Sequence, residues 1–331
     1  MINQQLVIGI DLGGTKISAA LVDAEGHIVL MQEIPTQAED GFHTTLQRMC
    51  ALVLSLCEGR KKEQQPIAIG VAVAAQVDPS SGTVIFAPNL AWHHVPLQEE
   101  LAKKLHLPVI VTGDVRAATF AEWQFGAGRG CDNFVCLFIG TGVGGGVVLG
   151  GHLQKGASNT LGELGHMIID MNGPPCSCGN WGCLEAYAGG WAIAAHAKKL
   201  VNNLAKKAST TDYKPSCLLE KCNGNASTIS AKMVIEAYQE GDVLSEQVVA
   251  KAVEAIVSGC ISIVNVLNPE RFVLGGSIAE NIPNLLNTIE QGIHKRALPA
   301  AWMPLKIVKA DLGHTAGVIG AAKIAFEACG R

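Results

Sequence analysis

Residues 11–16, Asp-Leu-Gly-Gly-Thr-Lys, place a carboxylate, two glycines, a hydroxyl and a cation directly after an apolar run. Gly13 and Gly14 allow backbone N–H groups to approach an anion. Thr15 can donate a hydrogen bond, and Lys16 can neutralise phosphate charge. Asp11, at the end of an expected strand, can hold Mg²⁺ directly or through water. The segment predicts a phosphate turn, and an ordinary hairpin turn is the alternative for these residues taken alone.

A second glycine-rich segment, residues 140–146, follows an apolar run at 134–139. Gly140, Gly142 and Gly145 match the spacing G-x-G-x-x-G of a dinucleotide site. That site requires a helix after the glycines, whereas residues 147–149 have the pattern of a strand. No G-x-x-x-x-G-K-[ST] motif occurs, which excludes a P-loop enzyme. We interpret 140–146 as a second phosphate turn, placed to clamp a triphosphate together with the first.

A third glycine pair, Gly275 and Gly276, ends the apolar segment 272–274 and precedes Ser277. Bare backbone at this point would let an adenine or ribose lie against the chain. A tight strand-to-helix turn is the alternative explanation.

Asp114 lies at the end of a buried strand expected over residues 109–112, before a segment of helical pattern at 116–125. Phosphoryl transfer to an alcohol needs a positioned base that takes the hydroxyl proton, and Asp114 is the candidate. The same residue also suits a helix N-cap, and the two roles are compatible.

Four further side chains could contact sugar hydroxyls. Glu163 and His166 lie in one short motif, Glu185 lies nineteen residues beyond His166, and Asn89 lies in the segment Pro-Asn-Leu-Ala-Trp at 88–92. Each offers a donor or an acceptor, although each taken alone would also suit a solvated loop.

Three thiols and one imidazole form a possible metal site: His166, Cys176, Cys178 and Cys183. Such a closed set is typical of structural zinc, which braces a loop and leaves no coordination position for catalysis. A reduced or disulfide-linked cysteine cluster is the alternative. An all-thiolate iron–sulfur site lacks a fourth nearby thiol. Because Glu163 and Glu185 flank the set, zinc would hold the two glutamates near each other.

The elements that position these residues form a repeated pattern of strand, glycine turn and strand. Strands are expected at 6–10, 17–22, 28–34, 67–73, 109–112, 134–139, 147–149 and 271–274, and helices at 42–57, 96–105, 116–125, 191–203, 228–240, 246–267 and 317–328. Residues 205–230 have the polar composition of a surface loop. We predict an α/β fold of two related lobes, 1–117 and 118–314, with a ligand cleft between them and helix 315–331 packed back on the first lobe.

Composition narrows the possible functions. The 331 residues are 48% hydrophobic and 16% charged with net charge −4, so a globular protein is expected and nucleic acid is an improbable partner. The uncharged run 255–267 is too short to span a bilayer, and the first residues do not resemble a signal peptide. Eleven cysteines, an odd number in a long chain, argue against a disulfide scaffold. We therefore expect a cytoplasmic protein.

These motifs together resemble the ROK family of bacterial sugar kinases, in the actin/hexokinase/Hsp70-like ATPase superfamily. The matching stretches are 11–16, 89–92, 140–146, 163–166, 176–185, 268–276 and 317–321. The resemblance implies two ribonuclease H-like lobes and an ATP-dependent hexose kinase, with glucose as the first expected substrate. It also implies Mg²⁺, structural Zn²⁺, and a homodimer or a dimer of dimers.

The resemblance also implies residue roles. Asp114 corresponds to the catalytic base, and Asn89, Glu163, His166 and Glu185 to sugar contacts, with His166 also a zinc ligand. The two phosphate loops correspond to Gly13, Gly14 and Thr15 and to Gly140, Thr141 and Gly142, and the adenosine site to Gly275 and Gly276.

Two positions depart from the family pattern. Gly113 replaces an asparagine that contacts a sugar hydroxyl, and Ala74-Ala75 replaces a common Pro-Gly. An N-acetylhexosamine kinase, for GlcNAc or ManNAc, and a fructokinase are therefore alternatives to a glucokinase. A non-catalytic sugar-sensing protein is a further alternative. The repressors of the family carry an N-terminal helix-turn-helix domain, for which the start of the first strand near Leu6 leaves no room.

Overall fold

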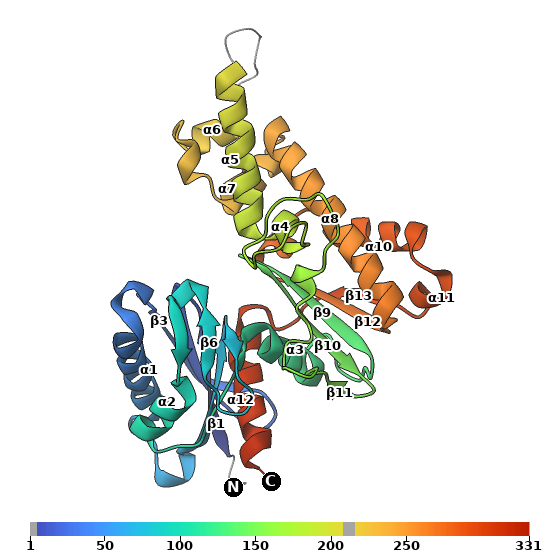
Figure 1. Cartoon of the computed structure of the whole chain (residues 1–331). Helices are drawn as coiled ribbons and strands as arrows, with labels where there is room; N and C mark the ends of the chain where they lie inside the picture. The colour runs from blue at the N-terminus through green and yellow to red at the C-terminus, as the bar shows by residue number, and fades with distance from the viewer. Residues whose placement is uncertain (1–4, 208–215, 331) are drawn as a thin grey trace. The chain divides into compact units, whose positions relative to one another are not determined.

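The computed structural model describes residues 5–207 and 216–330, which form two compact units (Figure 1). The first contains Met1–Asp132, Gly146–Gly162 and Ala310–Arg331, and the second contains Asn133–Gly145 and Glu163–Lys309. The lobe boundary expected after residue 117 lies inside α3 (Asp114–Phe125), and this division keeps the helix whole in the first unit.

The sheet of the first unit has the strand order β3-β2-β1-β4-β8. Its strands are β1 (Leu6–Leu12), β2 (Lys16–Val22), β3 (Ile28–Pro35), β4 (Pro66–Val73) and β8 (Val109–Gly113). β1, β2 and β3 pair antiparallel, whereas β4 and β8 run parallel to β1. Asp11 and Asp114 therefore lie at the same edge of the sheet, where the parallel strands end.

Alternation along β1 sends its side chains to two helical layers. Leu6, Ile8, Ile10 and Leu12 are buried on one face with residues of α1 (Gly41–Cys57) and α2 (Leu97–Leu105). Val7 faces the other side, where α12 (Ala316–Cys329) lies beside β1 (Figure 1). Each buried Leu or Ile side chain contributes roughly 1.5–3 kcal/mol to folding.

α12 approaches the sheet closely because the facing residues are glycines. A Cβ at Gly9 would lie 1.9 Å from the Val318 carbonyl oxygen, and one at Gly70 would lie 1.8 Å from the Ala321 carbonyl oxygen. The backbone of α12 thus packs directly on the backbone of β1 and β4.

The second sheet repeats this design with the order β11-β10-β9-β12-β13. Its strands are β9 (Phe134–Ile139), β10 (Val143–Leu149), β11 (His152–Leu153), β12 (Arg271–Gly275) and β13 (Lys306–Lys309). β12 is parallel to both β9 and β13. The repeat of strand, glycine turn and strand predicted from the sequence is present in both sheets.

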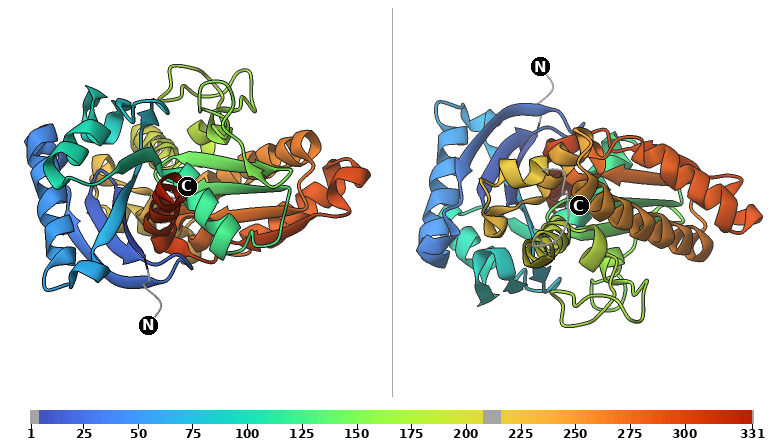
Figure 2. Two further views of the ribbon diagram at one scale, coloured as in Figure 1. Left: turned by 90° about the horizontal axis from the view of Figure 1, so that it is seen from below. Right: turned by 90° about the horizontal axis from the view of Figure 1, so that it is seen from above.

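The remaining elements complete the two units. They are α4 (Glu185–Ala188), α5 (Gly190–Lys207), α6 (Cys217–Lys221), α7 (Ala231–Gln239), α8 (Val243–Leu267), α9 (Ser277–Asn281), α10 (Leu285–Arg296) and α11 (Pro299–Trp302), a small sheet of β5 (Gln76–Val77), β6 (Val84–Ala87) and β7 (Trp92–Val95), and the 3₁₀ helices η1 (Ala38–Asp40), η2 (Lys62–Gln64), η3 (Pro88–Leu90), η4 (Leu164–His166), η5 (Ala226–Thr228) and η6 (Gly313–Thr315). Figure 2 shows α8 and α10 side by side.

Several local predictions were wrong. β10 begins at Val143, so the last glycines of segment 140–146 belong to a strand rather than a turn. Within the expected loop 205–230, α5 continues to Lys207 and α6 buries Leu218, while residues 208–215 lie outside the described part. α10 and the small sheet were not predicted at all.

α8 is the one described helix that is long and apolar enough to cross a membrane by length and composition. We had predicted that the apolar run 255–267 is too short to span a bilayer. That run is only the end of α8, which starts at Val243 and has 25 residues. Twelve of its residues are buried, and it packs against α5, α7 and α10. Burial within the second unit thus accounts for its apolar character.

Candidate functional site

The turn between β1 and β2 is closed by the Gly13 N–H, which donates to the Lys16 carbonyl oxygen over 3.0 Å. Gly14 is tightly covered, because a Cβ there would lie 2.9 Å from the Asn89 Cβ. The Lys16 ammonium pairs with Glu33 over 2.6 Å, with both side chains about half exposed. The turn and Asn89, which were predicted separately, are therefore in contact within the first unit.

Asp11 lies at the end of β1 beside this turn. Burial is the main cause that raises its pKa to about 6, the negative charge of Asp114 adds to the rise, and Lys16 opposes it. A Cβ at Gly317 would lie 2.5 Å from Oδ2 of Asp11, so the glycine gives this carboxylate its space. Two interacting carboxylates with a single nearby cation form a donor set that suits a hard divalent ion such as Mg²⁺.

Asp114 opens α3 directly after β8. The N-cap is Gly113, so the N-cap role that the sequence left open for Asp114 is not observed. Its Oδ1 instead accepts from the Val115 N–H over 2.8 Å. Burial raises the pKa of Asp114, while backbone N–H groups partly oppose that rise. A carboxylate with a raised pKa is a stronger base than an ordinary aspartate.

Asn89 lies in η3, between the buried Leu90 and the first phosphate turn. Ala91, which follows this helix, has φ 54° in the left-handed region, where an alanine is strained. Ala91 ends η3, and β7 begins at the next residue.

The second turn is held by the first residues of α5. The Gly190 N–H donates to the Gly140 carbonyl oxygen over 2.9 Å, and the Trp191 N–H donates to the Thr141 carbonyl oxygen over 3.2 Å. Within the turn, the Gly140 N–H donates to the Gly142 carbonyl oxygen over 2.9 Å. The carbonyl groups of Gly140 and Thr141 therefore face α5.

A pocket of about 530 Å³ adjoins the second turn, entirely within the second unit. Gly140 and Thr141 line it, together with the apolar side chains of Trp191, Ile235 and Ile278. Its volume and mixed lining suit a nucleoside. Gly275 and Gly276 do not line the pocket themselves. Gly276 has φ 93°, and its missing side chain lets the turn before Ser277 pack on the Ile139 backbone.

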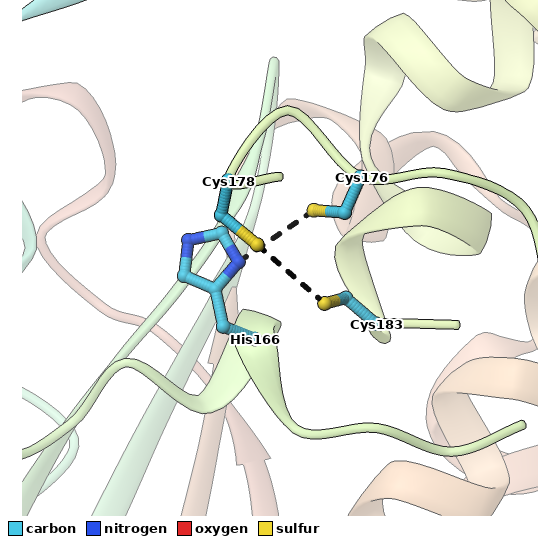
Figure 3. A group of neighbouring side chains, drawn as sticks. All are labelled: His166, Cys176, Cys178 and Cys183. Atoms are coloured by element: carbon cyan, nitrogen blue, oxygen red, sulfur yellow. Dashed lines mark hydrogen bonds between the residues drawn. The ribbon is translucent and has the colours of Figure 1, made fainter. Parts of the chain in front are cut away.

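The three thiols and the imidazole do converge, as Figure 3 shows. The Cys176 Sγ lies 3.7 Å from the His166 Nδ1, and the Cys178 Sγ lies 3.8 Å from the Cys183 Sγ. All four ligand atoms lie within 4.8 Å of one another. Tetrahedral zinc with Zn–S bonds of about 2.3 Å would place two sulfurs about 3.8 Å apart, so the donor set and the spacing both fit.

The two glutamates that flank this Cys/His cluster behave differently. Glu163 has a 57% exposed side chain, and its Oε2 lies 3.9 Å from the His166 Nε2. Glu185 is 9% exposed. Its Oε2 accepts from the Val143 N–H over 2.9 Å, and its Oε1 accepts from the Ser177 hydroxyl and the Trp191 indole N–H over 3.1 and 3.2 Å. Glu185 therefore connects the cluster with the second turn and with α5.

The sequence analysis did not predict the residues that stabilise these motifs through hydrogen bonds. Thr36 contacts the first turn, and Trp191 and Ser177 contact Glu185. Thr36 carried no signal beyond being a polar residue directly after a strand. Trp191 lies six residues after Glu185, and Gly189 separates the two helices that carry them. The helical spacing of three or four residues therefore could not predict this contact.

Comparison with known proteins identifies relatives over nearly the whole chain. The model of the ROK family matches residues 7–328. A glucokinase from Thermotoga maritima is 34% identical over 325 residues, which cover 98% of each chain. A glucokinase from Streptomyces coelicolor is 32% identical over 323 residues, 97% of this chain and 98% of that one. The crystal structure of a ROK family glucokinase from Streptomyces griseus in complex with glucose and AMPPNP has a TM-score of 0.80 at 33% identity, covering 97% of this chain and 99% of that one.

Replacing Glu185 tests its bridging contacts. In Glu185→Gln one oxygen becomes an NH₂ group, which in either orientation faces a donor, the Val143 N–H or the Ser177 and Trp191 pair, so we expect the free energy of unfolding to fall by about 1–3 kcal/mol. Urea unfolding measures this change. Glu163→Gln is the matched control and should change stability by less than about 0.5 kcal/mol, because its side chain is exposed. Equal stability of the two variants would contradict the bridge.

Proposed function

The chain belongs to the ROK family, and we propose that it transfers the γ-phosphoryl group of ATP to a hydroxyl of glucose. The observation that carries this proposal is the pair formed by Asp11 and Asp114 beside the first phosphate turn, with the pKa of both carboxyls raised. The similarity to glucokinases of two species supports glucose as the acceptor.

In the proposed reaction, Asp114 accepts the proton of the attacking sugar hydroxyl as the oxygen bonds to the γ-phosphorus, and ADP leaves with the electrons of the broken bond. The raised pKa of Asp114 brings its basicity nearer to that needed at neutral pH. Backbone N–H groups of the two glycine turns, with Thr15 and Lys16, would bind the phosphates. The pocket beside Gly140 would hold the adenosine.

Asp11 would hold Mg²⁺, because its carboxylate lies at the end of β1 beside the first glycine turn and interacts with that of Asp114. When bound, the ion would neutralise phosphate charge. Asn89, Glu163 and His166 are the proposed sugar contacts, with Glu185 as an additional one through its remaining lone pairs. His166 can serve two sites, since its Nδ1 faces the cysteines and its Nε2 faces Glu163.

We also propose that His166, Cys176, Cys178 and Cys183 hold a structural zinc ion, supported by the converging ligand atoms. A homodimer or a dimer of dimers, and a cytoplasmic location, are proposed from the family resemblance alone. An N-acetylhexosamine kinase and a fructokinase remain the alternative activities because of Gly113.

The experiment that tests the activity is an ADP-release assay with Mg·ATP against glucose, mannose, fructose, GlcNAc and ManNAc. We expect turnover on glucose, and Asp114→Asn should lower kcat by about 10²–10⁴-fold, the usual contribution of a general base, with little change in glucose affinity. Because Asp11 must be deprotonated to hold Mg²⁺ and its pKa is raised to about 6, kcat/KM should decline as the pH falls through about 6. Near-normal kcat in the variant would exclude Asp114 as the base. If the wild type releases no ADP with any of the sugars, the proposed kinase activity is wrong.

The acceptor site is tested at Gly113. A Cβ there would meet only the Ala75 carbonyl oxygen at 3.9 Å, and the backbone angles, φ −65° and ψ 145°, accept any residue. Gly113→Asn should therefore fold normally and lower KM for glucose by about threefold to tenfold, the effect of one added hydrogen bond. Gly113→Ala is the control that fills space without adding an amide. Equal KM values for the two variants would show that the amide makes no sugar contact.

Zinc is tested by metal analysis and stability. We expect one zinc per chain in the purified protein and less in Cys178→Ser, whose free energy of unfolding should fall by about 4 kcal/mol or more, as is typical of losing a structural metal. Cys50→Ser, at a partly buried cysteine of α1, should keep its zinc. A metal-free wild type with undiminished stability would refute the site.

A further inference from the structure

We propose that Thr36 is a positioning residue that fixes the first phosphate turn in its anion-binding conformation. The proposal rests on the proposed function, because it assumes that residues 11–16 bind phosphate. Thr36 follows β3 directly and is completely buried. It makes no contact with the expected sugar residues among the interactions described above, and nothing in the sequence motifs indicated it.

All three polar groups of Thr36 have partners. Its hydroxyl donates to the Gly13 carbonyl oxygen over 2.7 Å, and its N–H donates to the Thr15 carbonyl oxygen over 2.9 Å. Its own carbonyl oxygen accepts from Nη1 of Arg48 over 2.9 Å. One residue thus binds two carbonyl groups of the turn and is itself held by a guanidinium from α1.

These contacts determine which way the turn presents its N–H groups. In a planar trans peptide the C=O and the N–H point in opposite directions. Since the Gly13 carbonyl faces Thr36, the Gly14 N–H points away from Thr36. The Thr15 carbonyl likewise sends the Lys16 N–H away. N–H groups that are left directed away from the supporting residue can together bind a phosphate oxygen, and we infer that these two do so.

Arg48 extends this support into α1. Its Nη1 also donates to the Gln37 carbonyl oxygen over 3.3 Å, and its Nη2 pairs with the Asp40 carboxylate. The Arg48 side chain is only 23% exposed, so its interactions are better shielded from water than those of an ordinary surface pair. The line of contacts from Asp40 through Arg48 and Thr36 to Gly13 therefore preorganises the turn before nucleotide binds, which lowers the entropic cost of binding.

The test compares variants by calorimetric titration with Mg·ADP and by the KM values for ATP and glucose. Thr36→Val keeps the shape and the N–H but removes the hydroxyl donor. It should raise the Kd for Mg·ADP by about tenfold, the equivalent of one well-formed hydrogen bond, and raise KM for ATP more than KM for glucose. Thr36→Ser restores the hydroxyl and should remain within about threefold of wild type.

Thr45→Val is the matched control, because Thr45 is also fully buried and its hydroxyl donates only within α1, to the Gly41 carbonyl oxygen. Its Kd for Mg·ADP should stay within about twofold of wild type. Folding of each variant is checked by circular dichroism. A Thr36→Val protein that folds and binds Mg·ADP as tightly as Thr45→Val would overturn the proposal.

Two outcomes separate this proposal from the proposed function. If the wild type binds Mg·ADP but phosphorylates no hexose, the proposed kinase activity is wrong. The role of Thr36 is then decided by the Kd of Thr36→Val for Mg·ADP. A wild type without affinity for Mg·ADP would overturn both. If Thr36→Val does not fold, Arg48→Met is used instead. It removes the donor to the Thr36 carbonyl oxygen, and because the Arg48 side chain is more exposed than Thr36, the variant is expected to fold. It should raise the Kd by about threefold, and an unchanged Kd would overturn the proposal.

Discussion

The constraint on which both glycine turns depend is the direction of their carbonyl groups. In the first turn the carbonyls of Gly13 and Thr15 face Thr36, and in the second those of Gly140 and Thr141 face the first N–H groups of α5. Peptide planarity then sends the following N–H groups to the opposite side. Glycine allows these conformations but does not select one, because it loses more conformational entropy on ordering than other residues. The donors behind the turns make that selection.

The Cys/His cluster belongs to the same arrangement through Glu185. One carboxylate oxygen binds the Val143 N–H, at the point where the second turn becomes β10, and the other binds Ser177 inside the cluster. Trp191 donates to that second oxygen from α5, the helix that also holds the turn. The loop that carries His166 and the three cysteines is thus connected directly with the second turn by hydrogen bonds. Its integrity should matter for the nucleotide side as well as for the sugar side.

The fold could be predicted well where periodicity is strong, since the strands before each glycine turn and most of the longer helices, α10 excepted, were identified to within a few residues. β10 was missed at its start because Gly144 to Gly146 resemble a turn. In the structure the Thr119 side chain fills the space beside Gly146, because a Cβ at position 146 would lie 2.0 Å from the Thr119 Oγ1. A glycine that serves close packing in a strand cannot be distinguished from a turn glycine by sequence alone. The positioning roles of Thr36 and Glu185 were missed for a similar reason, because they arise from contacts between distant segments.

The two departures from the family pattern, which the sequence presents as separate, fall at one place. β4 and β8 are paired so that Val73 lies beside Gly113, and the chain after β4 brings the Ala75 carbonyl oxygen to 3.9 Å from where a Cβ at position 113 would lie. Loss of the asparagine side chain and replacement of Pro-Gly by Ala-Ala therefore alter the same wall, next to Asp114. A carbonyl oxygen accepts but cannot donate, so this wall would favour an acceptor sugar that presents a hydroxyl or amide N–H toward it. We therefore expect selectivity among hexoses to depend on this wall beside Asp114, the proposed base, while both glycine turns keep the residues that the family resemblance requires.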